Sequence, residues 1–174
     1  MLHKLILGGL LFISTITFAQ KTMKVGKQQI EVPGNLVSAI ELVDYANNKI
    51  GSLITYTSIE KAKAVFTYVY TDADKPYIIT QQIIKKAEVV GMKQEITVEK
   101  AFVDSEMKTN PKNYWSVSVS FRLANNNAAE VGTTIDVRDA GSKNEYKGTS
   151  YLVPFKDKKN AVAFVESLKK MLGY

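Results

Sequence analysis

Residues 114–123 read YWSVSVSFRL, and from Trp115 onward apolar side chains alternate with small polar or charged ones. Successive side chains of a β-strand point to opposite faces, so this period of two predicts a strand that buries one face. The face predicted to be buried consists of Trp115, Val117, Val119, Phe121 and Leu123. The opposite face carries Ser116, Ser118, Ser120 and Arg122, and is expected to be exposed or covered by a partner.

A second alternating stretch follows at residues 131–137, and residues 146–153 predict a third strand. Short segments rich in Asn, Gly and Asp separate the three stretches, at residues 125–127 and 139–142. These residue types favour turns because they tolerate left-handed backbone conformations or hydrogen-bond their own backbone. Three strands joined by short turns predict an antiparallel meander.

The chain ends on a stretch with helical periodicity. Asp157 is suited to cap a helix and Gly173 to end one, and lysines occupy the last turn at Lys169 and Lys170. Between the ends, apolar residues recur at spacings of three and four, at Ala161, Phe164, Val165, Leu168, Met171 and Leu172. The pattern predicts an amphipathic helix that packs on a sheet.

The segments before residue 114 are rich in β-branched and aromatic residues. Residues 65–71 and 77–80 predict a hairpin around a turn at 72–76, and residues 95–98 with 101–103 predict a strand after a turn at Gly91. Residues 80–90 fit either a strand extension or a helix. Helical spacing after Asn35 predicts an early helix, with its apolar positions at Leu36, Ala39, Ile40, Val43 and Ala46.

Thr57 and Glu60 have the spacing of a capping box, which competes with the strand predicted after Lys63. The density of aromatic and β-branched residues favours the strand, with one helical turn at 58–62. Together these elements predict an α+β class. We expect a curved, mainly antiparallel sheet or half-open barrel of six to eight strands, with an early helix and a C-terminal helix packed on it.

This order of elements resembles two known architectures over most of the chain. One is the pleckstrin-homology-like half-open barrel, in which seven strands precede a helix. The other is the helix-grip fold of Bet v 1-like proteins, in which a sheet wraps a C-terminal helix around a cavity. The resemblance implies a fold and no particular function.

The N-terminus has the pattern of a secretory signal peptide at residues 1–19. A basic start at Lys4 precedes an apolar stretch, and Thr17 and Ala19 form a small-x-small cleavage site. The alternative is an uncleaved anchor, but the apolar stretch is shorter than the ~20 residues that cross a bilayer. We therefore expect a single domain at residues 20–174, periplasmic or secreted, with no membrane span after cleavage.

Composition excludes several chemistries from that domain. The sequence has no cysteine, and its one histidine, His3, lies in the signal peptide. Nucleophile systems that depend on imidazole, zinc sites and disulfides are therefore not expected, so we predict no metal and no cofactor. Removing Lys4 with the signal leaves 22 basic and 17 acidic residues, a charge of +5. The basic residues are scattered lysines, so we predict no nucleic-acid partner.

The aromatic residues are the first candidate binding site. Aromatic rings on a strand face line pockets for apolar ligands or stack on sugars, although they also serve as core. Phe66, Tyr68 and Tyr70 share one face of their predicted strand. The full predicted set is Phe66, Tyr68, Tyr70, Tyr77, Tyr146 and Tyr151.

Charged residues give weaker candidates. Asp72 with Asp74, and Asp136 with Asp139, are possible calcium ligands that turn chemistry also explains. No spacing marks a carboxylate pair for hydrolysis among Glu41, Asp44, Glu60, Glu95, Glu99 and Asp104. A cationic edge at Lys156, Lys158, Lys159, Lys169 and Lys170 fits an anionic partner or a solvated helix face.

These observations predict an exported, non-catalytic binding module with no catalytic residue. Its expected ligand is small and apolar or amphipathic, held in a cavity between sheet and helix. The first alternative is a protein-interaction or envelope-structural domain with an envelope protein as partner. The second is a hydrolase based on carboxylates.

Overall fold

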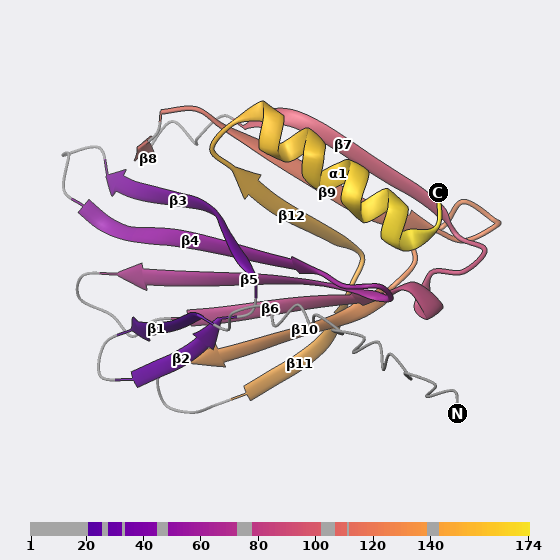
Figure 1. Ribbon diagram of the computed structural model, residues 1–174, viewed down its shortest axis with the longest axis horizontal. Helices are drawn as coiled ribbons and strands as arrows, with labels where there is room; N and C mark the ends of the chain where they lie inside the picture. The colour runs from indigo at the N-terminus through magenta and orange to yellow at the C-terminus, as the bar shows by residue number, and fades with distance from the viewer. Residues whose placement is uncertain are drawn as a thin grey trace, which may run out of the picture.

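The computed structural model describes residues 21–25, 28–32, 34–44, 49–72, 78–101, 107–110, 112–138 and 143–174. Within these ranges the chain forms antiparallel sheets and one α-helix, α1 (Lys158–Leu172), at the C-terminus. Figure 1 shows the strands in two main layers with α1 beside them. The predicted antiparallel sheet and C-terminal helix are confirmed.

The larger sheet has seven strands in the order β11-β10-β6-β5-β4-β3-β8. Its central hairpin confirms the strands predicted on either side of residues 72–76, with Tyr70 opposite Ile78 and Phe66 opposite Gln82. β-Branched and aromatic side chains favour this pleated backbone. The strands are β3 (Asn35–Asp44), β4 (Lys49–Ile59), β5 (Lys63–Asp72), β6 (Ile78–Lys85), β8 (Met107–Asn110), β10 (Val131–Arg138) and β11 (Lys143–Gly148).

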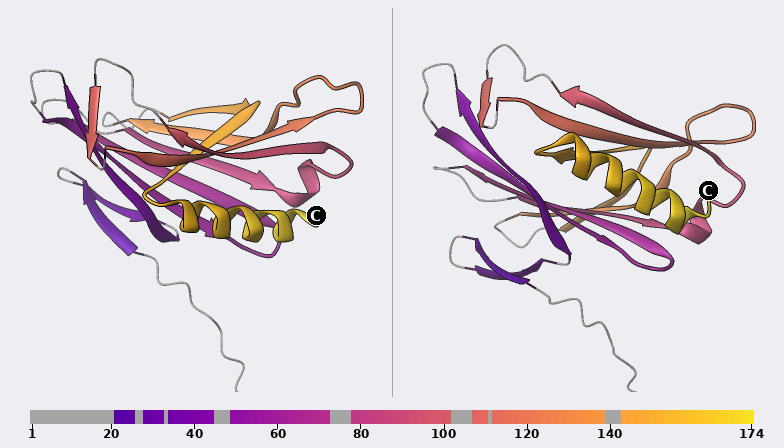
Figure 2. Two further views of the ribbon diagram at one scale, coloured as in Figure 1. Left: turned by 90° about the horizontal axis from the view of Figure 1, so that it is seen from above. Right: turned by 45° about the horizontal axis from the view of Figure 1, so that its top comes forward.

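The smaller sheet has three strands, β7 (Lys93–Ala101), β9 (Tyr114–Arg122) and β12 (Ser150–Phe155), with β9 in the middle. The alternation that predicted β9 is confirmed from Val117 to Phe121, because Val117, Val119 and Phe121 are fully buried. Leu123, also predicted to be buried, follows the end of β9 and is 42% exposed. Trp115, which begins this row, is partly buried against the core. A separate hairpin of β1 (Lys21–Val25) and β2 (Gln28–Val32) lies apart from α1 in both views of Figure 2.

The predicted meander is wrong in its pairing. β9 and β10 are consecutive in sequence but lie in different sheets. The last predicted strand divides into two, of which β11 pairs with β10 and β12 pairs with β9. The register shifts between Val131 and Thr134, where Gly132 has a φ of 67°. A bulge of this kind bends a strand, and here it lies where the chain passes between sheets.

The predicted early helix is also wrong, because residues 35–44 form β3. This strand pairs with β4 on one side and β8 on the other. Ser38 and Ile40 are buried while Ala39 between them is exposed, which is the period of a strand. Hydrogen bonds to two neighbouring strands outweigh local helical spacing. Ala46 lies outside the described residues.

The two ambiguous segments resolve mainly as strand. β4 extends to Ile59, and the amide of Glu60 donates to the carbonyl of Lys63 at 2.8 Å, so residues 60–63 form a hairpin turn in place of a helical one. β6 extends to Lys85 and is followed by one 3-10 turn, η1 (Lys86–Glu88). The turn at Gly91 is confirmed, with a φ of 78°.

Helix α1 has the predicted ends and the predicted buried face. The carboxylate of Asp157 accepts a hydrogen bond from the amide of Asn160 at 2.8 Å, and Gly173 is left-handed with a φ of 94°. Figure 2 shows α1 running alongside the three-stranded sheet, and α1 also contacts β4 and β5. Its buried residues are Ala161, Phe164, Leu168, Met171 and Leu172.

Aromatic rings fill the centre between helix and sheets. The ring of Phe66 lies 5.6 Å from that of Phe164 and 6.3 Å from that of Tyr151, both in edge-on geometry. Phe155 completes the group at 5.1 Å from Phe164. Edge-on packing of this kind stabilises a core beyond simple area burial. The described strands do not close into a barrel.

Candidate functional site

A groove of about 710 Å³ lies between one side of α1 and the adjoining ends of β3 and β4. We call it the α1 groove. Three segments line it: the start of β3, the β4–β5 turn, and one side of α1 with the strand end before it. Its lining residues are Gly34, Asn35, Leu36, Val37, Thr57, Ser58, Ile59, Glu60, Lys61, Phe155, Asn160, Ala163, Phe164, Ser167, Lys170 and Met171.

The side of α1 that lines the groove carries small residues in the middle of the helix. Ala163 and Ser167 are four residues apart and therefore lie one above the other on the same side of α1. The Ser167 hydroxyl donates to the carbonyl of Ala163 at 3.0 Å, which keeps it against the helix. Both residues are exposed to the groove side of the helix.

The remaining lining includes a set of apolar side chains that belong to the core. Phe155, Phe164 and Met171 are buried residues that also line the groove. On the strand side, Val37 and Ile59 are packed partly against the same core. Leu36 is 50% exposed. The groove therefore joins the surface directly to the aromatic core.

Gly34 allows the chain to begin β3 close to β4. Its φ is 97°, and a Cβ atom at this position would overlap the backbone carbonyl of Thr57. A residue with a side chain would have to push the two strands apart. The close approach of Gly34 to Thr57 therefore holds the start of β3 against the end of β4, and both segments line the groove.

The lining of the groove contains two basic residues and one acidic residue. Glu60 is its one acidic lining residue, and its Oε2 lies 3.3 Å from Nζ of Lys63. Lys61 and Lys170 also line the groove and are exposed. Among the described residues neither of these two lysines forms an ion pair. The rim of the groove therefore carries two cations and a partly neutralised anion.

A second hollow, of about 370 Å³, lies between β12 and the strands β4, β5 and β6. We call it the tyrosine hollow. The hydroxyl of Tyr68 donates to the carbonyl of Leu152 at 2.7 Å, with Oε1 of Gln82 at 3.0 Å. Burial raises the pKa of Tyr68, and neighbouring Tyr151 raises it further. The lining residues are Leu53, Tyr68, Tyr70, Ile78, Thr80, Gln82, Ser150 and Leu152.

The six aromatic residues predicted as a ligand site are divided among three places. Phe66 and Tyr151 are fully buried in the core, whereas Tyr68 and Tyr70 line the tyrosine hollow. Tyr146 on β11 is about half exposed. Tyr77 lies outside the described residues. Of the five that the structure describes, two therefore share one hollow and none lines the α1 groove.

Asp136 links Tyr146 to the edge of the tyrosine hollow. Its Oδ1 accepts a hydrogen bond from the hydroxyl of Thr80 at 2.7 Å, and its Oδ2 accepts one from the hydroxyl of Tyr146 at 3.2 Å. Desolvation raises the pKa of Tyr146, and the charge of Asp136 and this hydrogen bond add to the rise. These two hydrogen bonds account for the position of the Asp136 carboxylate without a bound metal ion.

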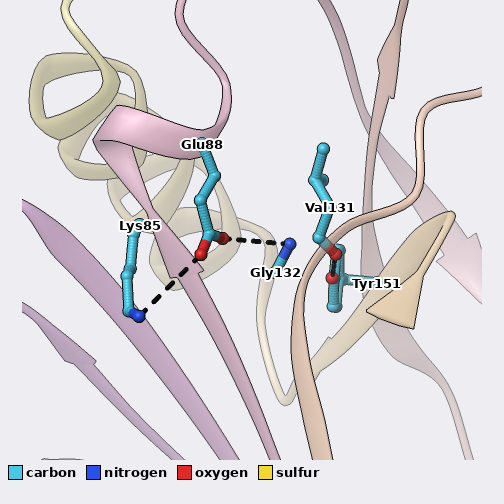
Figure 3. A network of polar contacts seen from close by, with 5 residues as sticks. All are labelled: Lys85, Glu88, Val131, Gly132 and Tyr151. Atoms are coloured by element: carbon cyan, nitrogen blue, oxygen red, sulfur yellow. Dashed lines mark hydrogen bonds and ion pairs between the residues drawn. The ribbon is translucent and has the colours of Figure 1, made fainter. Parts of the chain in front are cut away.

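Tyr151 belongs to a polar network between the two sheets, shown in Figure 3. Its hydroxyl donates to the carbonyl of Val131, and the next amide, of Gly132, donates to Oε2 of Glu88 at 3.1 Å. Lys85 lies 3.8 Å from the other oxygen of Glu88. Burial raises the pKa of Tyr151 to about 12, and the charge of Glu88 adds to the rise. The network joins β12, β10, β6 and η1 and therefore connects the two sheets.

The described residues contain no group of three or more His, Cys, Asp or Glu placed to hold a metal ion. Within the same part of the chain, no helix has the length and hydropathy that a membrane span requires. The side chains of Asp72, Asp74 and Asp139 lie outside the part that the structure describes.

Sequence reasoning missed the α1 groove as a site, although Lys170 belongs to the cationic edge predicted for an anionic partner. The available signal was the pair of small residues, Ala163 and Ser167, beside the apolar stripe of α1, since small residues lower one side of a helix. The strand wall gave no such signal, because the segment at Leu36 was predicted to be helical.

Comparisons with known proteins assign no family to this chain. The chain matches no family model, no curated protein and no solved structure.

Proposed function

We propose that this protein is an exported, non-catalytic binding module that takes a small apolar or amphipathic ligand in the α1 groove. The observation that carries the proposal is an open groove whose lining includes the core residues Phe155, Phe164 and Met171. Its volume of about 710 Å³ falls in the range of about 300–1,000 Å³ common for small-molecule sites. The signal-peptide pattern of residues 1–19 supports a periplasmic or secreted location.

The groove differs from the cavity expected between sheet and helix. Aromatic rings fill that central space, so the ligand would lie along one side of α1 with part of its surface exposed. An amphipathic molecule suits this arrangement because its apolar part would cover Leu36 and the partly buried Val37 and Ile59, while its polar part stays in water.

A second candidate is recognition of an envelope protein at the tyrosine hollow. The observation that favours it is Leu152, which is 60% exposed and lines that hollow together with Tyr70. Exposed apolar surface rimmed by polar groups is typical of protein-interaction sites. In this case the α1 groove would have no ligand of its own.

Native mass spectrometry of the protein purified after export tests the first candidate. We expect added mass that disappears on denaturation, and its value would identify the class of ligand. A titration with N-phenyl-1-naphthylamine, a neutral apolar fluorescent probe, tests the groove itself without depending on the purification host. Absence of probe binding would contradict the proposed function and favour the second candidate.

A pair of adjacent helix variants locates the bound probe. Ala163→Phe places a ring in the α1 groove, whereas Val162→Phe adds the same ring at a neighbouring exposed position that does not line it. We expect Ala163→Phe to weaken probe binding at least about tenfold, a loss of about 1.4 kcal/mol, and Val162→Phe to leave it unchanged. Equal effects of the two variants would place the probe elsewhere.

A further inference from the structure

We infer that the ligand of the α1 groove carries an anionic headgroup, which Lys61 and Lys170 bind. This inference rests on the proposed function and adds the charge of the ligand. The class it names is a single-chain amphiphile with a carboxylate or similar anion at one end.

The two lysines come from different elements that form different walls of the groove. Lys61 lies in the turn between β4 and β5, and Lys170 lies in the last turns of α1. An anion between the walls would therefore meet positive charge from both sides. Lysine also packs its methylene stem along apolar surface while its ammonium group stays in water, which suits a rim above an apolar lining.

The nearby negative charges do not cancel these cations. Glu60 is held by Lys63, with 3.3 Å between the charged atoms. Asp157 does not line the groove, and neither Asp157 nor Glu166, one turn before Lys170, forms an ion pair with the two lysines. Lys61 and Lys170 have no ion pair within the described part of the chain. The charge of the groove is therefore complementary to an anion.

Two amphiphiles with the same alkyl chain and opposite charge test this inference. Dodecanoate and dodecyltrimethylammonium each compete with N-phenyl-1-naphthylamine for the purified protein, below their micellar concentrations. We expect dodecanoate to compete at least about fivefold more tightly at low salt, and the difference to shrink as salt screens the charges.

Three lysine variants locate the charge. Lys61→Gln and Lys170→Gln each remove a cation from the groove, and we expect each to weaken dodecanoate about two- to fivefold. Lys169→Gln is the matched control, because Lys169 is adjacent on α1 and does not line the groove. Binding of dodecyltrimethylammonium should not weaken in any of the three.

The failures of the two proposals are distinguishable. If both amphiphiles displace the probe equally, or if Lys169→Gln behaves as the two groove variants do, the anionic headgroup is refuted while the groove remains a ligand site. If the probe and both amphiphiles fail to bind, the proposed function itself is refuted.

Discussion

Substituting Gly132 by alanine should lower the free energy of unfolding by about 1–3 kcal/mol more than the same change at Gly91. Both glycines have left-handed backbone, with φ of 67° and 78°. They differ in the space that a Cβ atom would find. At Gly132 it would meet the carbonyl of Ile83 and the hydroxyl of Tyr151 at 2.5 Å, whereas at Gly91 nothing lies within 4 Å. Comparing the two variants therefore separates the cost of left-handed backbone, which both share, from the cost of steric overlap, which arises only at Gly132.

The expected magnitudes follow from this difference. Left-handed backbone costs an alanine about 1–2 kcal/mol relative to glycine, and this contribution is common to both variants. At Gly132 the added methyl also displaces the Tyr151 hydroxyl from the carbonyl of Val131, and a lost buried hydrogen bond costs about 1–3 kcal/mol. We expect Gly132→Ala to lose about 2–5 kcal/mol of unfolding free energy and Gly91→Ala about 1–2 kcal/mol.

Urea titration of the two variants and the parent protein measures this difference. The fluorescence of Trp115, the single tryptophan of the chain, reports unfolding because its side chain is partly buried against the core. The slope of the transition should not change, since the same surface is exposed in each case. Equal losses in Gly132→Ala and Gly91→Ala would refute the role assigned to the contact between Gly132 and Tyr151.

Two further stability predictions use the same titration. Tyr151→Phe should lose about 1–3 kcal/mol, because the carbonyl of Val131 loses its buried donor. The pKa of Tyr151 is raised from 10.0 to about 12, so its contribution is complete below pH 10 and falls as pH rises from about 10 to about 12. The variant should therefore lose less stability than the parent over that interval, and an identical loss would contradict the assignment. Leu168→Ala should lose about 2–5 kcal/mol, because Leu168 is fully buried between α1 and the sheets. Val162→Ala on the exposed side of α1 should lose less than about 1 kcal/mol, and comparable losses at the two positions would show that the helix buries a different face.

The predictions that succeeded depend on interactions close in sequence. In β9, alternation alone places Val117, Val119 and Phe121 on the buried face. In α1, the Asp157 cap and the spacing of Phe164, Leu168 and the other apolar residues define the ends and the packed side. Each of these features is determined within a few residues of chain, by side-chain direction and by the free backbone groups of a helix end.

The candidate site was predicted less well, for a different reason. The aromatic set contained two residues of the tyrosine hollow, Tyr68 and Tyr70, but also the core rings of Phe66 and Tyr151. Alternation places all of these on chemically similar strand faces, and it cannot tell which stretch of a face another element will cover. The α1 groove exists because helix and strands that are distant in sequence leave a gap beside Ala163 and Ser167.

The sequence by itself determined the strand-rich class, the C-terminal helix with its buried side, and the absence of cysteine and imidazole chemistry after residue 19. Only the tertiary structure decided that residues 35–44 form a strand, since hydrogen bonds to β4 and β8 stabilise an extended backbone that local spacing does not favour. It also decided that β9 pairs with β12 and β7 instead of β10. The physical reason is the same in each case: strand pairing and the hollows between elements are set by contacts between segments far apart in the chain, and local side-chain patterns do not contain that information.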